Sequence, residues 1–401
     1  MYERFIARQP ILDVNLKVLG YELLFRARED NRAGADPSAT SQLIVSSTML
    51  FDWNSLVDGA CAHINFGKEE IISGAGLLLP SAQTVIEVPC TIDFGEETIE
   101  GLKNLRTAGY RIALDGFSGQ SHVQTALRYA SFVKVDFLGT KTVDHSLVKT
   151  LCASRDIGII AKRVESWKVF EQAQALGYSY FQGYFFLEPQ LLKRRDLAGT
   201  AAHCVELLKL IHQRPLELMK IEEVLKREPA LMYKLLRFLN SPLMARPVEV
   251  RSVHSAIALL GEDEFRRWAS LVALILPAAE KPNELIRTGL TRAFFCEALG
   301  KARGSGATTF EFFVVGLFSV MSAILDRPLA DIVAEMAVSA GVRDALTGAK
   351  NEMRHALDAA MAFESGKWEE FARAMESLQI EEQKGPDFLR EADRIVKDLQ
   401  I

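Results

Sequence analysis

The chain has 401 residues, 49% of them hydrophobic, a length that suggests two or three domains with sizeable cores. With 47 basic against 52 acidic residues the formal net charge is −5, and no long lysine or arginine block occurs. This balance argues against general DNA or RNA binding, which needs a clustered positive face. The five cysteines are dispersed without a CxxC pair, which predicts a reduced cytoplasmic protein without a disulfide framework or zinc site.

No segment is expected to enter a membrane. The first residues lack the long apolar stretch of a signal peptide. The longest apolar run, residues 312–325, is interrupted by Gly316, Ser319 and Ser322 and is too short for a comfortable span. We therefore predict a buried core helix there.

The first half of the chain predicts strands that alternate with helices. Strand-like segments recur roughly every 22 to 26 residues, with centres near Ile64, Ile86, Ile112, Lys134, Ile160 and Gln182. Helices are predicted between them at residues 96–108, 143–153 and 166–176. A βα unit repeated at this period is typical of a parallel sheet with crossover helices, and enough units close into a barrel. The polar residues Asn65, Glu87 and Asp115 end their strands, on the rim where barrel enzymes place their chemistry.

After about Ala198 the strand pattern stops and only helices are predicted. Proline and serine starts and glycine stops delimit them at residues 229–239, 252–260, 262–276, 328–339, 352–363 and 368–378. We therefore expect an α/β domain over residues 1–198 and an all-helical domain over residues 199–401.

Short motifs follow one another in a fixed order through the first half. They are Gln9-Pro10-Ile11, Tyr21-Glu22-Leu23-Leu24-Phe25-Arg26, Ile64-Asn65-Phe66, Ile86-Glu87-Val88, Leu114-Asp115-Gly116-Phe117, Lys134-Val135-Asp136, Ala161-Lys162-Arg163-Val164-Glu165 and Gln182-Gly183-Tyr184. None is specific alone, but in this order they resemble the EAL family, the phosphodiesterases of the bacterial messenger cyclic di-GMP. The resemblance implies a TIM-type (β/α) barrel.

A second set of motifs lies in the helical half. They are Glu228-Pro229, Leu239-Asn240-Ser241, Ser252-Val253-His254-Ser255-Ala256-Ile257, Leu259-Leu260-Gly261 and Gly316-Leu317-Phe318. They resemble the HDOD domain, an all-α relative of the HD-type metal phosphohydrolases that lacks their catalytic residues. The chain contains no His-Asp pair, and Ser319-Val320 stand where the pair would be expected. The histidines His203, His212, His254 and His355 are widely spaced, so we expect helix-surface or capping roles for them.

The EAL resemblance implies a set of site residues. Phosphodiester hydrolysis in this family uses two divalent ions, which activate water and neutralise the phosphate. Glu22, Asn65, Glu87 and Asp115 match the ligands of the first ion. Gln9, Leu24, Arg26, Lys134 and Gln182 match residues that contact the nucleotide or complete its pocket. Independently of the resemblance, a lysine between the apolar strand residues around Lys134 needs a buried anion, which a structural ion pair would also provide.

Two positions depart from the family pattern. Gly116 replaces the second aspartate of the pair that holds the other ion, and Lys162 replaces the catalytic glutamate; Arg163 stands at the neighbouring glycine and Cys90 at a nearby glutamate. The exchanges at Gly116 and Lys162 shift the local charge by about +3. An ammonium ~4 Å from a divalent ion would be repelled by roughly 8 kcal/mol at an effective dielectric of ~20. We therefore expect no active catalytic residue, and we expect Lys162 to take the missing ion's place as a fixed cation facing the remaining acids.

Three functions stay open. The first is a non-catalytic signalling protein of the cyclic di-GMP or two-component network that acts on other signalling proteins, which the resemblance links to motility and biofilm formation. The second is a cyclic di-GMP receptor that binds without hydrolysis, and the third is a weak phosphodiesterase in which neutral Lys162 is the base. No cofactor is expected to be required, with Mg²⁺ or Mn²⁺ at a vestigial first site as the alternative. A homodimer is compatible with the family, whereas nucleic-acid binding and membrane insertion are not expected.

Overall fold

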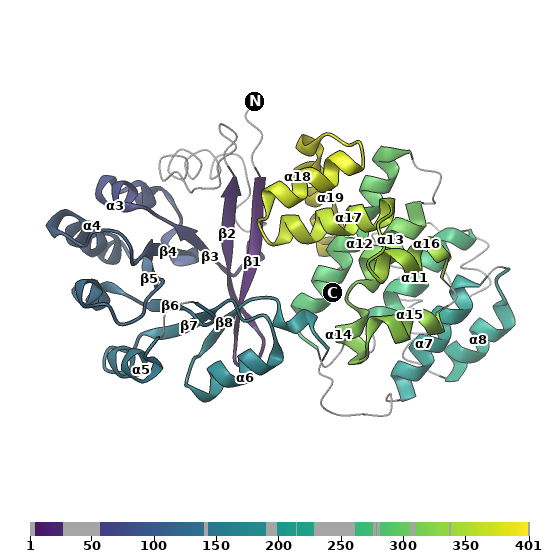
Figure 1. Cartoon of the computed structure of the whole chain (residues 1–401), viewed down its shortest axis with the longest axis horizontal. Helices are drawn as coiled ribbons and strands as arrows, with labels where there is room; N and C mark the ends of the chain where they lie inside the picture. Colours follow the sequence, from purple (N-terminus) through teal and green to yellow (C-terminus); the bar gives the residue numbers. More distant parts are fainter. Residues whose placement is uncertain are drawn as a thin grey trace. The chain divides into compact units, whose positions relative to one another are not determined.

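The computed structural model describes residues 5–26, 57–139, 143–189, 199–213, 215–227, 261–275, 278, 281–304, 309–336 and 338–399. The chain divides into two compact units (Figure 1). One consists mainly of residues 1–185 and the other mainly of residues 186–363 and 367–401. The predicted boundary between residues 198 and 199 adjoins residues 190–198, which lie outside the described part, and it stays a prediction.

Strands of the first unit close into a barrel in the order of the sequence. They are β1 (Phe5–Asp13), β2 (Val18–Arg26), β3 (Cys61–Asn65), β4 (Thr84–Pro89), β5 (Arg111–Asp115), β6 (Phe132–Asp136), β7 (Gly158–Lys162) and β8 (Tyr180–Gln182). Each predicted strand centre lies in one strand from β3 to β8, so the expected (β/α) barrel is confirmed. The barrel differs from an all-parallel one at β1, which pairs antiparallel with both β2 and β8.

A tight turn explains the antiparallel start, which the sequence reasoning did not predict. The Asp13 side chain accepts hydrogen bonds from the backbone N–H groups of Asn15 at 2.8 Å and Lys17 at 2.9 Å. Such an aspartate closes a turn by replacing backbone partners with its own carboxylate. The chain therefore returns from β1 to β2 without a crossover helix.

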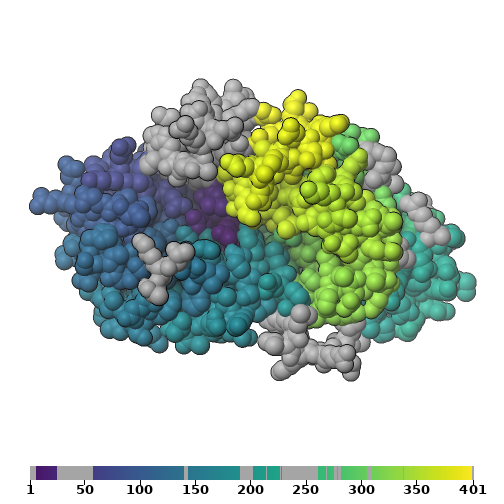
Figure 2. All heavy atoms as spheres, viewed as in Figure 1, coloured from purple at the N-terminus to yellow at the C-terminus, as the bar shows by residue number. Residues whose placement is uncertain are grey.

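Helices surround the rest of the barrel (Figure 1). They are α3 (Lys68–Ser73), α4 (Glu96–Thr107), α5 (His145–Ala153) and α6 (Trp167–Ala175). The helices α4, α5 and α6 confirm the predicted stretches. Side chains of Asp144 and Ser166 cap α5 and α6 by accepting hydrogen bonds from the backbone N–H groups of Leu147 and Val169. Figure 2 shows α3 and α4 on the outer surface of this unit, in purple to blue.

An apolar layer fills the barrel interior below its carboxyl-end rim. It is a cluster of buried residues, namely Ile11, Val85, Ala113, Phe132 and Ile160. Because side chains alternate along a strand, the residue two positions farther along points into the barrel as well. On β4 to β7 these next residues are Glu87, Asp115, Lys134 and Lys162. The strand alternation therefore places a charged layer directly above an apolar one.

The second unit is helical throughout its described residues, which confirms the predicted all-α domain. Its helices are α7 (Gly199–His212), α8 (Leu218–Arg227), α11 (Glu262–Ile275), α12 (Asn283–Arg303), α13 (Thr309–Phe318), α14 (Met321–Leu325), α15 (Leu329–Glu335), α16 (Ala340–Leu346), α17 (Glu352–Glu364), α18 (Trp368–Ser377) and α19 (Gly385–Asp398). None of the helices in the described part of the chain is long and apolar enough to span a membrane. The predicted helices at residues 229–239 and 252–260 lie outside the described residues, as does His254.

The predicted core helix at residues 312–325 is wrong in one respect, because it is two helices. Helix α13 ends at Phe318 and α14 begins at Met321. Between them the Ser319 hydroxyl donates to the Gly316 carbonyl at 2.7 Å, a bond that competes with continuation of the helix. Both helices are nevertheless buried in the core, as predicted.

Glycine allows α12 and α13 to pack closely. A Cβ atom on Gly316 would lie 2.4 Å from the Arg292 carbonyl oxygen, and one on Gly300 would lie 2.8 Å from the Phe312 ring. Backbone atoms cannot yield to such a contact, because a packed interior has no room for the displaced atoms. The glycine of the Gly316-Leu317-Phe318 motif is therefore required by helix packing.

His212 does not have the surface or capping role expected from the sequence. Its ring stacks on Phe310 at 5.7 Å and meets Phe318 edge-on at 5.4 Å. Its Nε2 atom lies 3.3 Å from Ser270 Oγ. Burial, with a smaller contribution from the nearby Arg266 guanidinium, lowers the pKa of His212 to about 3. The ring is therefore neutral in the folded unit.

This depressed pKa predicts that acid destabilises the helical unit. The unfolded chain protonates His212 near its ordinary pKa, whereas the folded unit resists protonation, so stability falls as pH drops below the unfolded value. Between about pH 7 and about pH 5 we expect His212 to remove about 2 kcal/mol from the free energy of unfolding. Urea unfolding of His212→Phe, which keeps the ring contacts, should lack this loss, with His355→Phe as the control. An unchanged pH dependence in His212→Phe would contradict the assignment.

Candidate functional site

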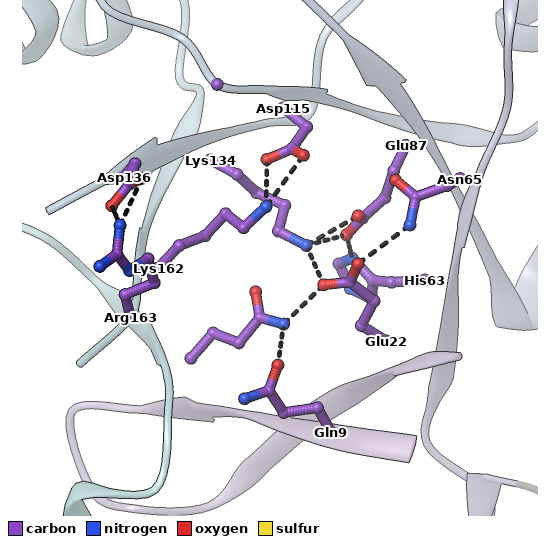
Figure 3. Close-up of polar contacts among 12 residues, drawn as sticks. Gln9, Glu22, His63, Asn65, Glu87, Asp115, Lys134, Asp136, Lys162 and Arg163 are labelled. Carbon is purple, nitrogen blue, oxygen red and sulfur yellow. Dashed lines mark hydrogen bonds and ion pairs between the residues drawn. The ribbon is translucent and has the colours of Figure 1, made fainter. Parts of the chain in front are cut away.

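Polar side chains from several strands converge at the carboxyl-end rim of the barrel (Figure 3). At their centre is Lys134, whose side chain is 0% exposed. Its Nζ atom lies 2.6 Å from Glu22 Oε2, 2.6 Å from Glu87 Oε1 and 2.7 Å from Glu87 Oε2. The prediction that Lys134 needs a buried anion is confirmed. Two carboxylates, of Glu22 and Glu87, supply the negative charge.

Each of these carboxylates accepts further hydrogen bonds. Asn65 Nδ2 donates to Glu22 Oε1 at 2.9 Å, and Gln182 Nε2 donates to Glu22 Oε2 at 2.5 Å. Gln182 Nε2 also lies 2.8 Å from Gln9 Oε1. The structure therefore brings together Gln9, Glu22, Asn65, Glu87, Lys134 and Gln182, which the sequence assigned to one site.

Charge pairing outweighs desolvation in this cluster. Burial by itself would raise the pKa of Glu22, but the ammonium groups of Lys134 and Lys162 hold it well below its ordinary value. Burial by itself would lower the pKa of Lys134, but the carboxylates of Glu22, Glu87 and Asp115 raise it above its ordinary value. Glu22 and Lys134 are therefore both ionised at neutral pH, as a paired buried charge requires.

His63 belongs to the site, and the sequence reasoning missed it. It is fully buried on β3, and its Nδ1 atom lies 2.9 Å from Glu87 Oε1. Burial lowers the pKa of His63 below its ordinary value, so the ring is neutral and Nδ1–H donates to the carboxylate. Among the described residues, its buried Nε2 atom has no hydrogen-bond partner. The signal was available, because His63 precedes Asn65 by two residues and shares its face of the strand.

A second ion pair lies beside the first, nearer the rim. Lys162 Nζ lies 2.9 Å from both carboxylate oxygens of Asp115, and the two side chains are 26% and 19% exposed. Burial raises the pKa of Asp115, against the opposing effect of Lys134 and Lys162. The expectation that Lys162 faces one of the remaining acids is confirmed. Farther out, Arg163 pairs with Asp136 at 3.2 Å through largely exposed groups, a contact worth little in water.

Gly116 and Arg163, two positions that differ from the family residues, both have left-handed backbone. Gly116 has φ +76°, and a side chain there would meet nothing within 4 Å. Arg163 has φ +61° without being glycine, which costs roughly 1–2 kcal/mol. Gly183 of the Gln-Gly-Tyr motif is a steric requirement, since a Cβ would lie 2.0 Å from the Val164 carbonyl oxygen. Space therefore permits an acid at position 116, and the sequence lacks it.

The remaining predicted residues contribute less to this cluster. Leu24 is partly buried on β2, and the side chain of Arg26 lies outside the described residues. Cys90 is buried, and its backbone N–H donates to the Asp115 carbonyl at 2.7 Å. Burial and the Asp115 charge raise the pKa of the Cys90 thiol to about 12. The thiol therefore supplies no negative charge to the site.

The donor set does not fit a two-ion centre. Gly116 offers no side-chain ligand, and the cationic end of Lys162 is directed at Asp115, one of the expected ligands. Lys134 is hydrogen-bonded to Glu22 and Glu87, two other expected ligands. In the described ranges no group of three or more histidine, cysteine, aspartate or glutamate residues is arranged to hold a metal ion.

Comparison with known proteins agrees with both resemblances. The EAL domain matches residues 69–189 and the HDOD domain matches residues 198–362. The cyclic di-GMP phosphodiesterase CdgJ of Vibrio cholerae is 31% identical over 92% of this chain and 87% of its own length. The chain belongs to the EAL–HDOD family. The uncharacterized protein YuxH of Bacillus subtilis is 29% identical over 94% of this chain and 95% of its own length.

Solved structures match part of this EAL–HDOD chain. BlrP1 of Klebsiella pneumoniae, in a complex with calcium and cyclic di-GMP, is 22% identical, with a TM-score of 0.38. The match covers 46% of this chain and 55% of that chain.

In the HDOD domain, Ser319 stands at the position expected for the absent His-Asp pair, and Arg292 Nη1 lies 3.2 Å from its Oγ atom.

The two lysines are expected to differ in their contribution to stability. Lys134→Met leaves Glu22 and Glu87 as unpaired buried acids and should cost about 3–5 kcal/mol of the free energy of unfolding. Lys162→Met breaks a pair that is partly exposed and should cost about 1 kcal/mol or less. Urea unfolding of both variants measures this, with the exposed Lys149→Met as the control. Equal losses in the two variants would contradict the central place given to Lys134.

Proposed function

We propose that this EAL–HDOD protein is a non-catalytic signalling protein of the cyclic di-GMP or two-component network. It acts through contacts with other signalling proteins, and its barrel does not hydrolyse cyclic di-GMP. The observation that carries the proposal is the bidentate contact of Lys162 Nζ with Asp115 at 2.9 Å. The resemblance places the catalytic glutamate of an active enzyme at position 162.

Chemistry at this position supports the proposal. Two-ion hydrolysis requires carboxylates that hold both ions and activate a water molecule between them. A general base needs a free lone pair, and an ammonium that donates to both oxygens of a carboxylate has none. Lys162 therefore supplies neither a metal ligand nor a base in this arrangement.

The HDOD domain supports a role in protein interaction. Its polar groups serve helix packing, as with Ser319 and His212, and its sequence contains no His-Asp pair. A helical module without a reactive centre is suited to binding and not to catalysis. We place its partners among the signalling proteins that control motility and biofilm formation.

Residual phosphodiesterase activity is a competing function. It is favoured by the similarity to CdgJ, which is named as a cyclic di-GMP phosphodiesterase and is 31% identical to this chain over 375 residues. In this alternative Lys162 would have to leave Asp115, lose its proton and act as the base.

A hydrolysis assay separates these two functions. Wild-type protein with Mg²⁺ should release no linear dinucleotide from cyclic di-GMP above the rate of Lys134→Met. The double variant Gly116→Asp, Lys162→Glu restores two acids at a site with room for them, and should gain turnover. Aspartate tolerates the left-handed backbone of position 116 better than most residues. Turnover by the wild type above the rate of Lys134→Met would refute the proposal, and a double variant that is then no faster would also refute the account of the missing acids.

Cyclic di-GMP binding without hydrolysis is the second competing function. It is favoured by the single cluster that holds Gln9, Lys134 and Gln182, three of the predicted nucleotide contacts. In this alternative Arg26, matched by the resemblance to a nucleotide contact, is required as well.

Titration calorimetry with cyclic di-GMP tests this alternative. Under the proposal we expect no saturable heat, in agreement with a second technique such as equilibrium dialysis. Saturable binding that Arg26→Ala abolishes would replace the proposal with a receptor. Binding that survives Arg26→Ala would show that the nucleotide contacts were transferred to the wrong residues.

A further inference from the structure

A short turn from late in the sequence belongs to the barrel unit. This compact unit contains Glu364–Gly366 in addition to residues 1–185. Gly366 has a left-handed backbone with φ +65°, and the Lys367 backbone N–H donates to the Ala362 carbonyl at 2.9 Å. These are the marks of a helix that ends at a glycine, here α17. The turn therefore has a fixed shape of its own.

The turn contacts residues at the carboxyl ends of two strands. Tyr184 follows Gln182, the last residue of β8, by two positions, and its hydroxyl donates to the Glu364 carbonyl at 2.7 Å. On β2, a Cβ atom at Gly366 would lie 2.9 Å from Leu24 Cδ1 and 3.5 Å from Leu24 Cβ. The Gly366 backbone therefore lies directly against the Leu24 side chain.

Leu24 is on the face of β2 that points into the barrel. Glu22, two residues earlier, reaches Lys134 Nζ at 2.6 Å inside the barrel, and side chains alternate along a strand. Leu24 is therefore the next inward residue toward the carboxyl end, where it is partly buried. The family resemblance assigns this residue to contact with the nucleotide. Protein backbone thus lies where a nucleotide would meet Leu24.

We infer that the turn Glu364–Gly366 is an autoinhibitory element that fills the nucleotide's place beside Leu24 and excludes cyclic di-GMP from the barrel. The inference deepens the proposed function and rests on it for the identity of the excluded ligand. It gives the absence of binding a cause of its own, separate from Gly116 and Lys162, which concern hydrolysis. Because a nucleotide binds only where the turn is open, its apparent affinity falls with the fraction of open molecules.

A disulfide trap in the full chain tests the position of the turn. The pair Leu24→Cys, Gly366→Cys has its Cβ atoms 3.5 Å apart, a separation that a disulfide spans. Mild oxidation should link the two cysteines, and mass spectrometry of the digested protein should find the joined peptides. In the control pair Leu24→Cys, Gly59→Cys, the second position also has a left-handed backbone, with nothing within 4 Å of its Cβ. Absence of the 24–366 link, or equal linking in the control, would overturn the inference.

Displacing the turn tests the exclusion of the nucleotide. Tyr184→Phe removes the hydrogen bond to Glu364, and Gly366→Val places a β-branched residue on a left-handed backbone, where it is strained. By titration calorimetry, the double variant should bind cyclic di-GMP at least tenfold more tightly than the wild type. Arg26→Ala in the same background should abolish the gain, since the resemblance assigns Arg26 to the same nucleotide.

A matched control separates the contact with Leu24 from backbone strain. Gly304 also ends a helix, α12, and has φ +67° with nothing within 4 Å of its Cβ. Gly304→Val should bind cyclic di-GMP no better than the wild type, and an equal gain there would overturn the inference. If the double variant does not fold, Tyr184→Phe alone keeps the ring and should give a smaller gain in affinity.

The outcomes distinguish the inference from the proposed function. A folded Tyr184→Phe, Gly366→Val variant without a gain in binding would overturn the inference and leave the non-catalytic role standing. Equal binding by the wild type and this variant would overturn it as well. Hydrolysis of cyclic di-GMP by the wild type would instead refute the proposed function, whereas the disulfide trap would still report where the turn lies.

Discussion

An ammonium group in a protein interior is stable only when anions surround it, and the barrel of this protein is built around one. Lys134 lies 112 residues from Glu22 and 47 from Glu87, yet it contacts both. These contacts form only when β2, β4 and β6 close in one register. Loss of that register would leave three charges buried without partners, at a cost of several kcal/mol. The ion cluster and the barrel therefore stabilise each other.

Exchange of a metal ion for an ammonium changes what such a site can do. A divalent ion has open coordination positions that polarise a phosphate and activate water. An ammonium carries one charge, and its protons are already donated to carboxylates in this structure. Under the proposed function, the Lys162 ammonium supplies positive charge beside Asp115 without this reactivity. This difference is the physical basis for proposing a signalling role within a family that includes a named phosphodiesterase.

The HDOD domain shows the same use of polar groups for structure. Gly316 lets α13 approach the backbone of α12, and Ser319 bonds to the last turn of α13. His212 is held neutral between two phenylalanine rings. In an HD-type hydrolase a His-Asp pair would bind metal. Here the polar side chains of the described residues hold helices together.

Local patterns of the sequence were enough to predict strands β3 to β8, helices α4, α5 and α6, the helical second domain and the family. They also located the acids that end the strands and the cation at Lys162, because periodicity and residue type are properties of short segments. The contact of Lys134 with two glutamates, the place of His63 beside Glu87 and the packing of the His212 ring against Phe310 and Phe318 could not be predicted this way. Nor could the β1–β2 hairpin that starts the barrel. These features depend on strand register, barrel closure and helix packing, which join residues far apart in the chain and leave no signature in any one segment.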